Sequence, residues 1–136
     1  MKFTENDQEE EMIPIDCKNG SVRQSIFEAL CHIPIAVRRP LDATTKIVTT
    51  HSRFGYCMEV LQGARIIFLN HLIVPENSVR KQHHFYRWFV CVVMHEVAHA
   101  HLKHQGGEED PAQEAEAWGK AIEWYNGYAP GRDNVP

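Results

Sequence analysis

In the C-terminal half of the chain, an apolar segment runs directly into two histidines, and few folds can accommodate that order. Residues 88–93 (WFVCVV) are apolar on every side of a helix, and His95 and His99 follow four positions apart. A helix that is apolar all round is buried in the centre of a fold. Residues four apart lie on one face of a helix, so both imidazoles can reach one ion. The pattern predicts a long central helix over residues 78–104 that carries a metal site.

Glu96 directly follows His95 and completes a recognised sequence motif. Glu96 lies about 100° around the helix axis from His95, so its carboxylate can reach a water molecule at the metal rather than the metal itself. His-Glu-x-x-His is the spacing of zinc hydrolases. A catalytic zinc has three protein ligands and an open position for water. The alternative is a pair of core histidines that are hydrogen-bonded to neighbouring groups without a metal.

A third ligand is expected on the last helix, which is predicted to run from an N-cap at Asp110 to about Asn126. Helical geometry separates its glutamates, because one face is apolar and the other is polar. Glu114 lies in the middle of the apolar face, which is formed by Trp118, Ala121, Ile122 and Tyr125. Glu116 and Glu123 lie on the opposite, solvated face. A carboxylate aimed at a core needs a cation, so Glu114 is the predicted third ligand and Glu116 the second choice.

Two further histidines follow the pattern on the same predicted helix. On a continuous helix, His101 and His104 are turned away from the ligand face by about 140° or more. They are therefore not predicted to bind the same ion. We expect them at a solvated helix end, close to the negative end of the helix dipole.

The chain before the central helix predicts one helix and then strands. An amphipathic helix is predicted over residues 21–33, with Ser21 as its N-cap. Short β-branched or alternating segments then predict strands over residues 35–38, 46–50, 54–61 and 65–69. A Gln62-Gly63 step predicts a tight hairpin. The expected fold class is α+β: a small antiparallel or mixed sheet of three to four strands packs on the central helix, with an N-terminal and a C-terminal helix.

Length and composition bound the class of protein. The chain has 136 residues, which fits one domain. We expect that domain over residues 13–130, with an acidic mobile tail over residues 1–12 and a C-terminal tail over residues 131–136. A net charge of −4 argues against direct nucleic-acid binding, because phosphate contacts need clustered Lys and Arg.

The sequence also indicates where in the cell the protein is expected. No apolar run reaches the length of about 18 residues that a membrane helix needs. The acidic N-terminus has no apolar stretch behind a basic start, so no export signal is predicted. The four cysteines form no C-x-x-C pattern. The expected location is the cytoplasm, with four reduced thiols.

Three segments together resemble a known family. They are residues 65–70 (RIIFLN), the helix that ends in MHEVAHAHLKH, and EAEAW with Ala121 behind it. They resemble the ImmA/IrrE family of small metallopeptidases, which is similar to the wider gluzincin group. The resemblance covers about residues 55–126 and implies a zincin-like minimal domain with one zinc ion per chain. The implied site consists of the catalytic base Glu96 and the ligands His95, His99 and Glu114.

One position departs from the family pattern. The residue after the E-x-x-A alanine is often Asn or Asp in the family, and it is Trp118 here. A polar partner that orients a ligand is therefore either missing or supplied elsewhere. The resemblance also implies that the strand over residues 65–69 forms a sheet edge beside the cleft, where a substrate peptide can pair with it.

Spacing and resemblance together predict a zinc-dependent endopeptidase that hydrolyses a peptide bond of a protein substrate. In the family the usual partner is a helix-turn-helix repressor, so a DNA-binding transcriptional repressor is the implied substrate. The alternatives are a non-catalytic zinc-containing protein-interaction module, with a structural or dormant site, and a zinc hydrolase acting on a non-peptide amide. A donor that stabilises the oxyanion is also needed, and the candidates are Tyr86, His71 and His104. A further hypothesis is that a homo-oligomer or an adaptor contributes to substrate recognition by so short a chain.

Overall fold

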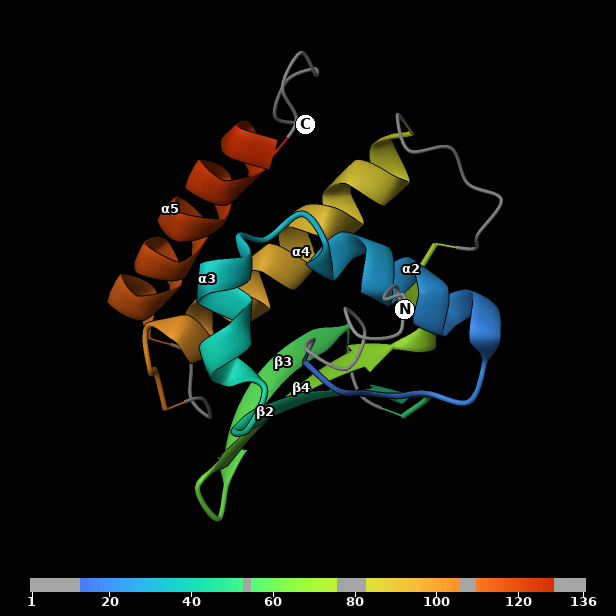
Figure 1. Ribbon diagram of the computed structural model, residues 1–136, viewed down its shortest axis with the longest axis horizontal. Helices are drawn as coiled ribbons and strands as arrows, with labels where there is room; N and C mark the ends of the chain where they lie inside the picture. Colours follow the sequence, from blue (N-terminus) through green and yellow to red (C-terminus); the bar gives the residue numbers. More distant parts are fainter. Residues whose placement is uncertain (1–12, 53–54, 76–82, 106–109, 129–136) are drawn as a thin grey trace, which may run out of the picture.

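The chain folds into a small sheet with its helices stacked on one side (Figure 1). The computed structural model describes residues 13–52, 55–75, 83–105 and 110–128. Helices α2 (Gly20–Leu30) and α4 (His84–His101) lie over the sheet, and α5 (Pro111–Tyr128) packs against α4. This arrangement confirms the predicted α+β class. The predicted N-terminal and C-terminal tails lie outside the described residues.

The sheet has four strands in the order β1-β2-β4-β3. Their bounds are β1 (Ile15–Asp16), β2 (Thr45–Thr50), β3 (Tyr56–Leu61) and β4 (Ala64–Asn70). Strands β1 and β4 both run parallel to β2, whereas β3 runs antiparallel to β4. The sheet is therefore mixed, which is one of the two predicted forms. It also holds β1, a two-residue strand that the sequence pattern does not reveal.

Strand β4 lies inside the sheet, between β2 and β3, so the prediction of an edge strand over residues 65–69 is wrong. The reason is that β4 is apolar on both faces. Ile67 and Leu69 are buried on one face, and Ile66 and Phe68 are half-buried on the other. Apolar side chains on both faces are typical of an interior strand.

The edge next to β4 is formed by β3 instead. It pairs antiparallel with β4 across Gln62 and Gly63, which confirms the predicted hairpin. Both turn residues have positive φ, 53° and 85°, as a type I′ turn requires. Among the described strands, β3 is paired on one side only, so its outer side forms a sheet edge.

Helix α2 begins earlier than its predicted start. Asn19, not Ser21, is the N-cap: its Oδ1 accepts the N–H groups of Ser21 at 3.0 Å and Val22 at 3.1 Å. The helix ends at Leu30 rather than at residue 33. Its buried side carries Ile26 and Leu30, which join the core beneath α4.

Residues 35–38, predicted as a strand, form a short helix, α3 (Ile35–Arg38), which runs into the 3-10 turn η1 (Arg39–Leu41). The strand prediction is wrong because local backbone bonds start at Pro34. The Pro34 carbonyl accepts the N–H groups of Val37 at 2.9 Å and Arg38 at 3.1 Å. β-branched side chains favour strands only weakly, so this turn of helix overrides them.

Helix α4 is the central helix that the apolar segment predicts, although Trp88 at the start of that segment is exposed rather than buried. Every residue from 92 to 100 is buried, and Phe89 is fully enclosed in the same core. Part of the predicted extension toward residue 78 lies outside the described residues. In the parts of the chain that the structure describes, no helix is both long and apolar enough to span a membrane.

The C-terminal end of α4 comes sooner than predicted. Helix α4 ends at His101, three residues before the predicted end at residue 104, and Lys103 with a φ of 63° takes the chain out of the helix. Two backbone bonds close this end: Lys103 N–H to Ala100 O at 3.1 Å, and His104 N–H to His99 O at 3.0 Å. This pair of bonds forms a Schellman motif, and it folds the chain back along the last turn of α4.

Candidate metal centre

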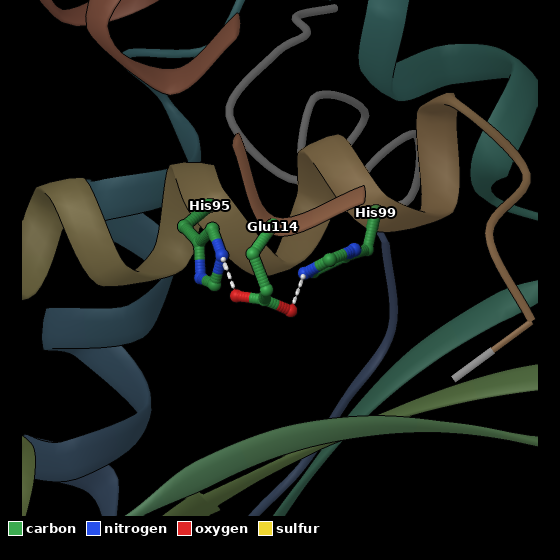
Figure 2. Close-up of side chains that lie close together, drawn as sticks. All are labelled: His95, His99 and Glu114. Carbon is green, nitrogen blue, oxygen red and sulfur yellow. Dashed lines mark hydrogen bonds and ion pairs between the residues drawn. The ribbon is translucent and has the colours of Figure 1, made fainter. Parts of the chain in front are cut away.

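Three side chains from two helices meet beside α4 (Figure 2). His95 and His99 come from α4, and Glu114 comes from the first turn of α5. One carboxylate oxygen of Glu114 lies 3.0 Å from His95 Nε2, and the other lies 3.0 Å from His99 Nε2. The ligand atoms of all three lie within 4.8 Å of one another. The structure thus brings together the three residues that the sequence analysis selects as metal ligands.

The start of α5 fixes the position of Glu114. Asp110 Oδ1 accepts the N–H groups of Ala112 at 2.9 Å and Gln113 at 3.4 Å, as expected of the predicted N-cap. The buried side of α5 carries Ala117, Ala121, Trp124 and Tyr125. Glu114 shares this side, since it precedes the two alanines by three and seven positions. Ile122, which was predicted to lie on this face, is exposed instead.

The site is buried except at Glu114. His95 and Glu96 are each 3% exposed, whereas the Glu114 side chain is 29% exposed and gives the site a side open to solvent. Burial lowers the pKa of His99, because desolvation disfavours the imidazolium, although the nearby Glu96 carboxylate raises it. The neutral imidazole, which is the form that binds metal ions, is favoured as a result.

Glu96 has an unsatisfied oxygen in this buried site. Its Oε2 lies 3.1 Å from His95 Nδ1, but the two groups are not oriented for a hydrogen bond. Among the described residues, Glu96 Oε1 and His95 Nδ1 are buried without a hydrogen-bond partner. A buried polar atom of this kind costs free energy unless it finds a donor, and a water molecule would provide one for the carboxylate.

Aromatic rings surround His95. The Trp118 ring stacks on its imidazole, with 4.0 Å between centroids and 9° between planes. Tyr56 of β3 meets the same imidazole edge-on at 6.2 Å. Trp118 was predicted to lie on the apolar face around Glu114, but its stacking on His95 was not predicted, and neither was the contact of Tyr56, because no local spacing links β3 to α4.

His104 is buried and contacts the site, so the prediction that it lies at a solvated helix end is wrong. It is 6% exposed, and its Nδ1 lies 2.8 Å from His99 Nδ1. Its Nε2 lies 2.8 Å from Oε1 of Glu116, the residue that was the second choice as a ligand. The angular argument fails because the helix ends at His101, and the Schellman motif turns His104 back onto His99.

The other two candidate oxyanion donors lie elsewhere. Tyr86 precedes His95 by nine positions on α4, which places it on the opposite side of that helix, and its side chain is buried. His71 follows β4 in the 3-10 turn η2 (His71–Ile73), where its ring stacks on His51 at 4.1 Å. The contacts of His104 with His99 and Glu116 point to a different role for it as well.

A thiol is not a competing nucleophile on this helix. Cys91 lies one turn before His95 on α4, and burial raises its pKa to about 11, although Arg87 opposes the shift. The neutral thiol is therefore the favoured form, and it is a poor nucleophile. The chemistry of this region rests on the imidazoles and carboxylates.

The donor set fits zinc. Two imidazole nitrogens and one carboxylate form the His₂Glu set of catalytic zinc sites, and the unsatisfied Glu96 oxygen lies beside them. Comparisons with protein-family models, curated proteins and solved structures found no significant match to this chain. The resemblance to the ImmA/IrrE family accordingly stays a prediction, and the functional argument rests on the geometry.

Proposed function

We propose that the protein is a zinc-dependent peptidase that cleaves a peptide bond of a protein substrate. The observation that carries this proposal is the convergence of His95, His99 and Glu114, with both Nε2 atoms 3.0 Å from one carboxylate. Zinc held by these residues would polarise the scissile carbonyl and activate the attacking water. The family resemblance adds a DNA-binding repressor as the candidate substrate.

Glu96 is the proposed general base. Its Oε1 has no hydrogen-bond partner in the part of the chain that the structure describes, so it is available to accept a proton from the attacking water. The same carboxyl group then donates that proton to the leaving amine. Because the side chain is only 3% exposed, bulk water does not compete strongly for this oxygen.

The edge of the sheet supplies a place for the peptide. Asn70 N–H donates to Gly55 O at 2.8 Å, and antiparallel pairing alternates. The backbone groups of Met58 and Val60 therefore point away from β4, toward the outer side of β3. An extended substrate can add to this edge, and Tyr56 at its start contacts His95.

Three ligands favour a catalytic over a purely structural zinc. Structural sites have four protein ligands, whereas catalytic sites have three and an open position. The ligating group found among the described residues has three members, and the partly exposed Glu114 leaves it accessible. These features support an enzyme rather than a non-catalytic zinc-binding interaction module.

The first experiment is zinc analysis of the protein, purified without chelator or affinity-tag metal. We expect about one zinc per chain in the wild type and a clear loss in Glu114→Ala. Glu123→Ala, which removes the same charge from an exposed position of α5, is the matched control and should keep its zinc. A wild type without zinc would overturn the proposal, and zinc retained in Glu114→Ala would reassign the third ligand.

The second experiment tests hydrolysis itself. We expect the zinc-loaded wild type to cleave members of a quenched fluorescent peptide library, and Glu114→Ala to leave them intact. A chelator should abolish the cleavage, and added zinc should restore it. A zinc-loaded wild type that cleaves neither peptides nor candidate repressors would instead favour the interaction module.

A further inference from the structure

We infer that His104 and Glu116 are positioning residues that fix the tautomer of His99, so that its Nε2 is held ready as a metal ligand. This inference rests on the proposed zinc site and extends it. It assigns a role to two residues that the ligand set does not contain. It also identifies a polar partner for a ligand in a chain that has Trp118 where the family often has Asn or Asp.

The hydrogen-bond chain fixes the proton positions in order. The Glu116 carboxylate accepts hydrogen bonds but cannot donate them, so His104 Nε2, at 2.8 Å, carries a proton and donates it. In the neutral form of His104 only one ring nitrogen carries a proton, so its Nδ1 is then an acceptor. His99 Nδ1, 2.8 Å away, must then be the donor, and the lone pair of His99 lies on Nε2.

That lone pair faces the ligand site. His99 Nε2 lies 3.0 Å from Oε2 of Glu114, which is itself an acceptor. Two acceptors at this distance repel each other unless a cation lies between them or beside them. The chain from Glu116 through His104 therefore prepares a nitrogen and an oxygen for a positive ion. Neighbours of ligating histidines act in this way at metal sites generally.

The fold holds His104 in place. The bonds that close α4, from Lys103 N–H to Ala100 O and from His104 N–H to His99 O, bring the His104 backbone back to the turn that carries His99. Its imidazole is 6% exposed, whereas the Glu116 side chain is 63% exposed. His104 is thus a buried, integral part of the site, whereas the exposed Glu116 can be replaced without opening the core.

The test compares zinc affinities, measured by competition with a chromogenic chelator. We expect His104→Ala to lose about 10- to 100-fold in affinity, the usual range for partners of metal ligands, and Glu116→Ala to lose up to about tenfold. The double variant should be no weaker than His104→Ala, because Glu116 acts through His104. Glu123→Ala is the control and should bind as the wild type does.

A second measurement, of the imidazole tautomers, can be made without metal. In the zinc-free protein at one fixed pH, ¹⁵N NMR of the imidazoles should show His99 protonated at Nδ1. Glu116→Ala should convert this signal to a mixture of tautomers, while the circular dichroism spectrum stays unchanged. A change of tautomer together with weaker zinc binding supports the positioning role.

The outcomes separate the two proposals. If zinc binding depends on Glu114 but is unaltered in Glu116→Ala and His104→Ala, only the positioning role is overturned. An unchanged His99 tautomer in Glu116→Ala overturns it as well. A wild type that binds no zinc overturns both the proposed function and this inference.

Discussion

The two imidazoles of the candidate metal centre are held by different means. Trp118 and Tyr56 enclose the ring of His95 at 4.0 and 6.2 Å, whereas His99 is hydrogen-bonded to His104 at 2.8 Å. Packing fixes the plane of a ring but leaves its tautomer open. A hydrogen bond to a neighbour of known polarity fixes both. Of the two imidazoles, His99 is therefore the one whose tautomer is fixed by a hydrogen bond.

Glu96→Gln tests the base at the scale of one functional group. Gln has nearly the shape of Glu but cannot take a proton from the attacking water. We expect the variant to keep about one zinc per chain and to lose about 100-fold or more in turnover, the range of general-base catalysis. Zinc content and the hydrolysis rate of a peptide that the wild type cleaves are the measurements.

The control for this variant is Glu123→Gln, the same change at an exposed position of α5. It should keep both zinc and turnover. Wild-type turnover in Glu96→Gln would remove Glu96 as the base. Loss of zinc in that variant would instead show that the carboxylate maintains the site.

At the scale of elements, the end of α4 is held in an uncommon conformation. Lys103 has a φ of 63°, in the left-handed region that costs a residue with a Cβ about 1 kcal/mol or more. Glycine is the usual residue at this position of a Schellman motif. The chain nevertheless adopts the turn, and its result is the contact of His104 with His99.

Lys103→Gly should remove this cost and leave the site unaltered. We expect the free energy of unfolding to rise by about 0.5–1 kcal/mol, measured by urea denaturation, with unchanged zinc affinity. Lys103→Ala keeps a Cβ, so it should bring no such gain. A Gly variant no more stable than the Ala variant would show that the helix end is not strained.

The elements most accessible from sequence are those with a strong local pattern. The all-round apolar run before His95 predicts the buried helix α4, and the Gln62-Gly63 step predicts the β3–β4 hairpin. The apolar face of the last helix selects Glu114 over Glu116. Each of these predictions depends on side chains close together in sequence, where periodicity is informative.

Other features depend on contacts that periodicity does not report. Strand β2 pairs in parallel with β4, on the side of β4 that faces away from β3. The expected edge strand is therefore an interior one. Two local backbone hydrogen bonds form the helical turn after Pro34, although the β-branched side chains there favour a strand. The position of His104 is predicted wrongly because α4 ends three residues earlier than the sequence indicates. A helix boundary is the least certain part of a sequence prediction, and here it governs the contact between His104 and His99.

At the scale of the whole molecule, the candidate metal centre lies between two helices that also contact each other by packing and by a hydrogen bond from Arg87 Nε to the Tyr125 hydroxyl at 3.1 Å. His95 and His99 come from the helix that lies on the sheet, and Glu114 comes from α5, which packs on the outer side of α4 (Figure 1). Without a cation, a carboxylate and two imidazoles that converge in a largely buried site carry a desolvation cost. An ion bound there would offset this cost and tie α5 to α4.

Zinc should therefore stabilise the folded chain as a whole. Free zinc at 100 times its dissociation constant adds about 2.7 kcal/mol to the free energy of unfolding, since the unfolded chain has no preformed site. For a domain of this length, that gain raises Tm by roughly 10 °C. Calorimetry of the wild type with zinc and with a chelator measures the shift, and Glu114→Ala should lose most of it. An equal shift in both proteins would mean that zinc binds elsewhere. No shift in the wild type would mean that α4 and α5 are held together by their apolar faces and the Arg87–Tyr125 hydrogen bond without an ion, with the three side chains serving a purpose other than metal binding.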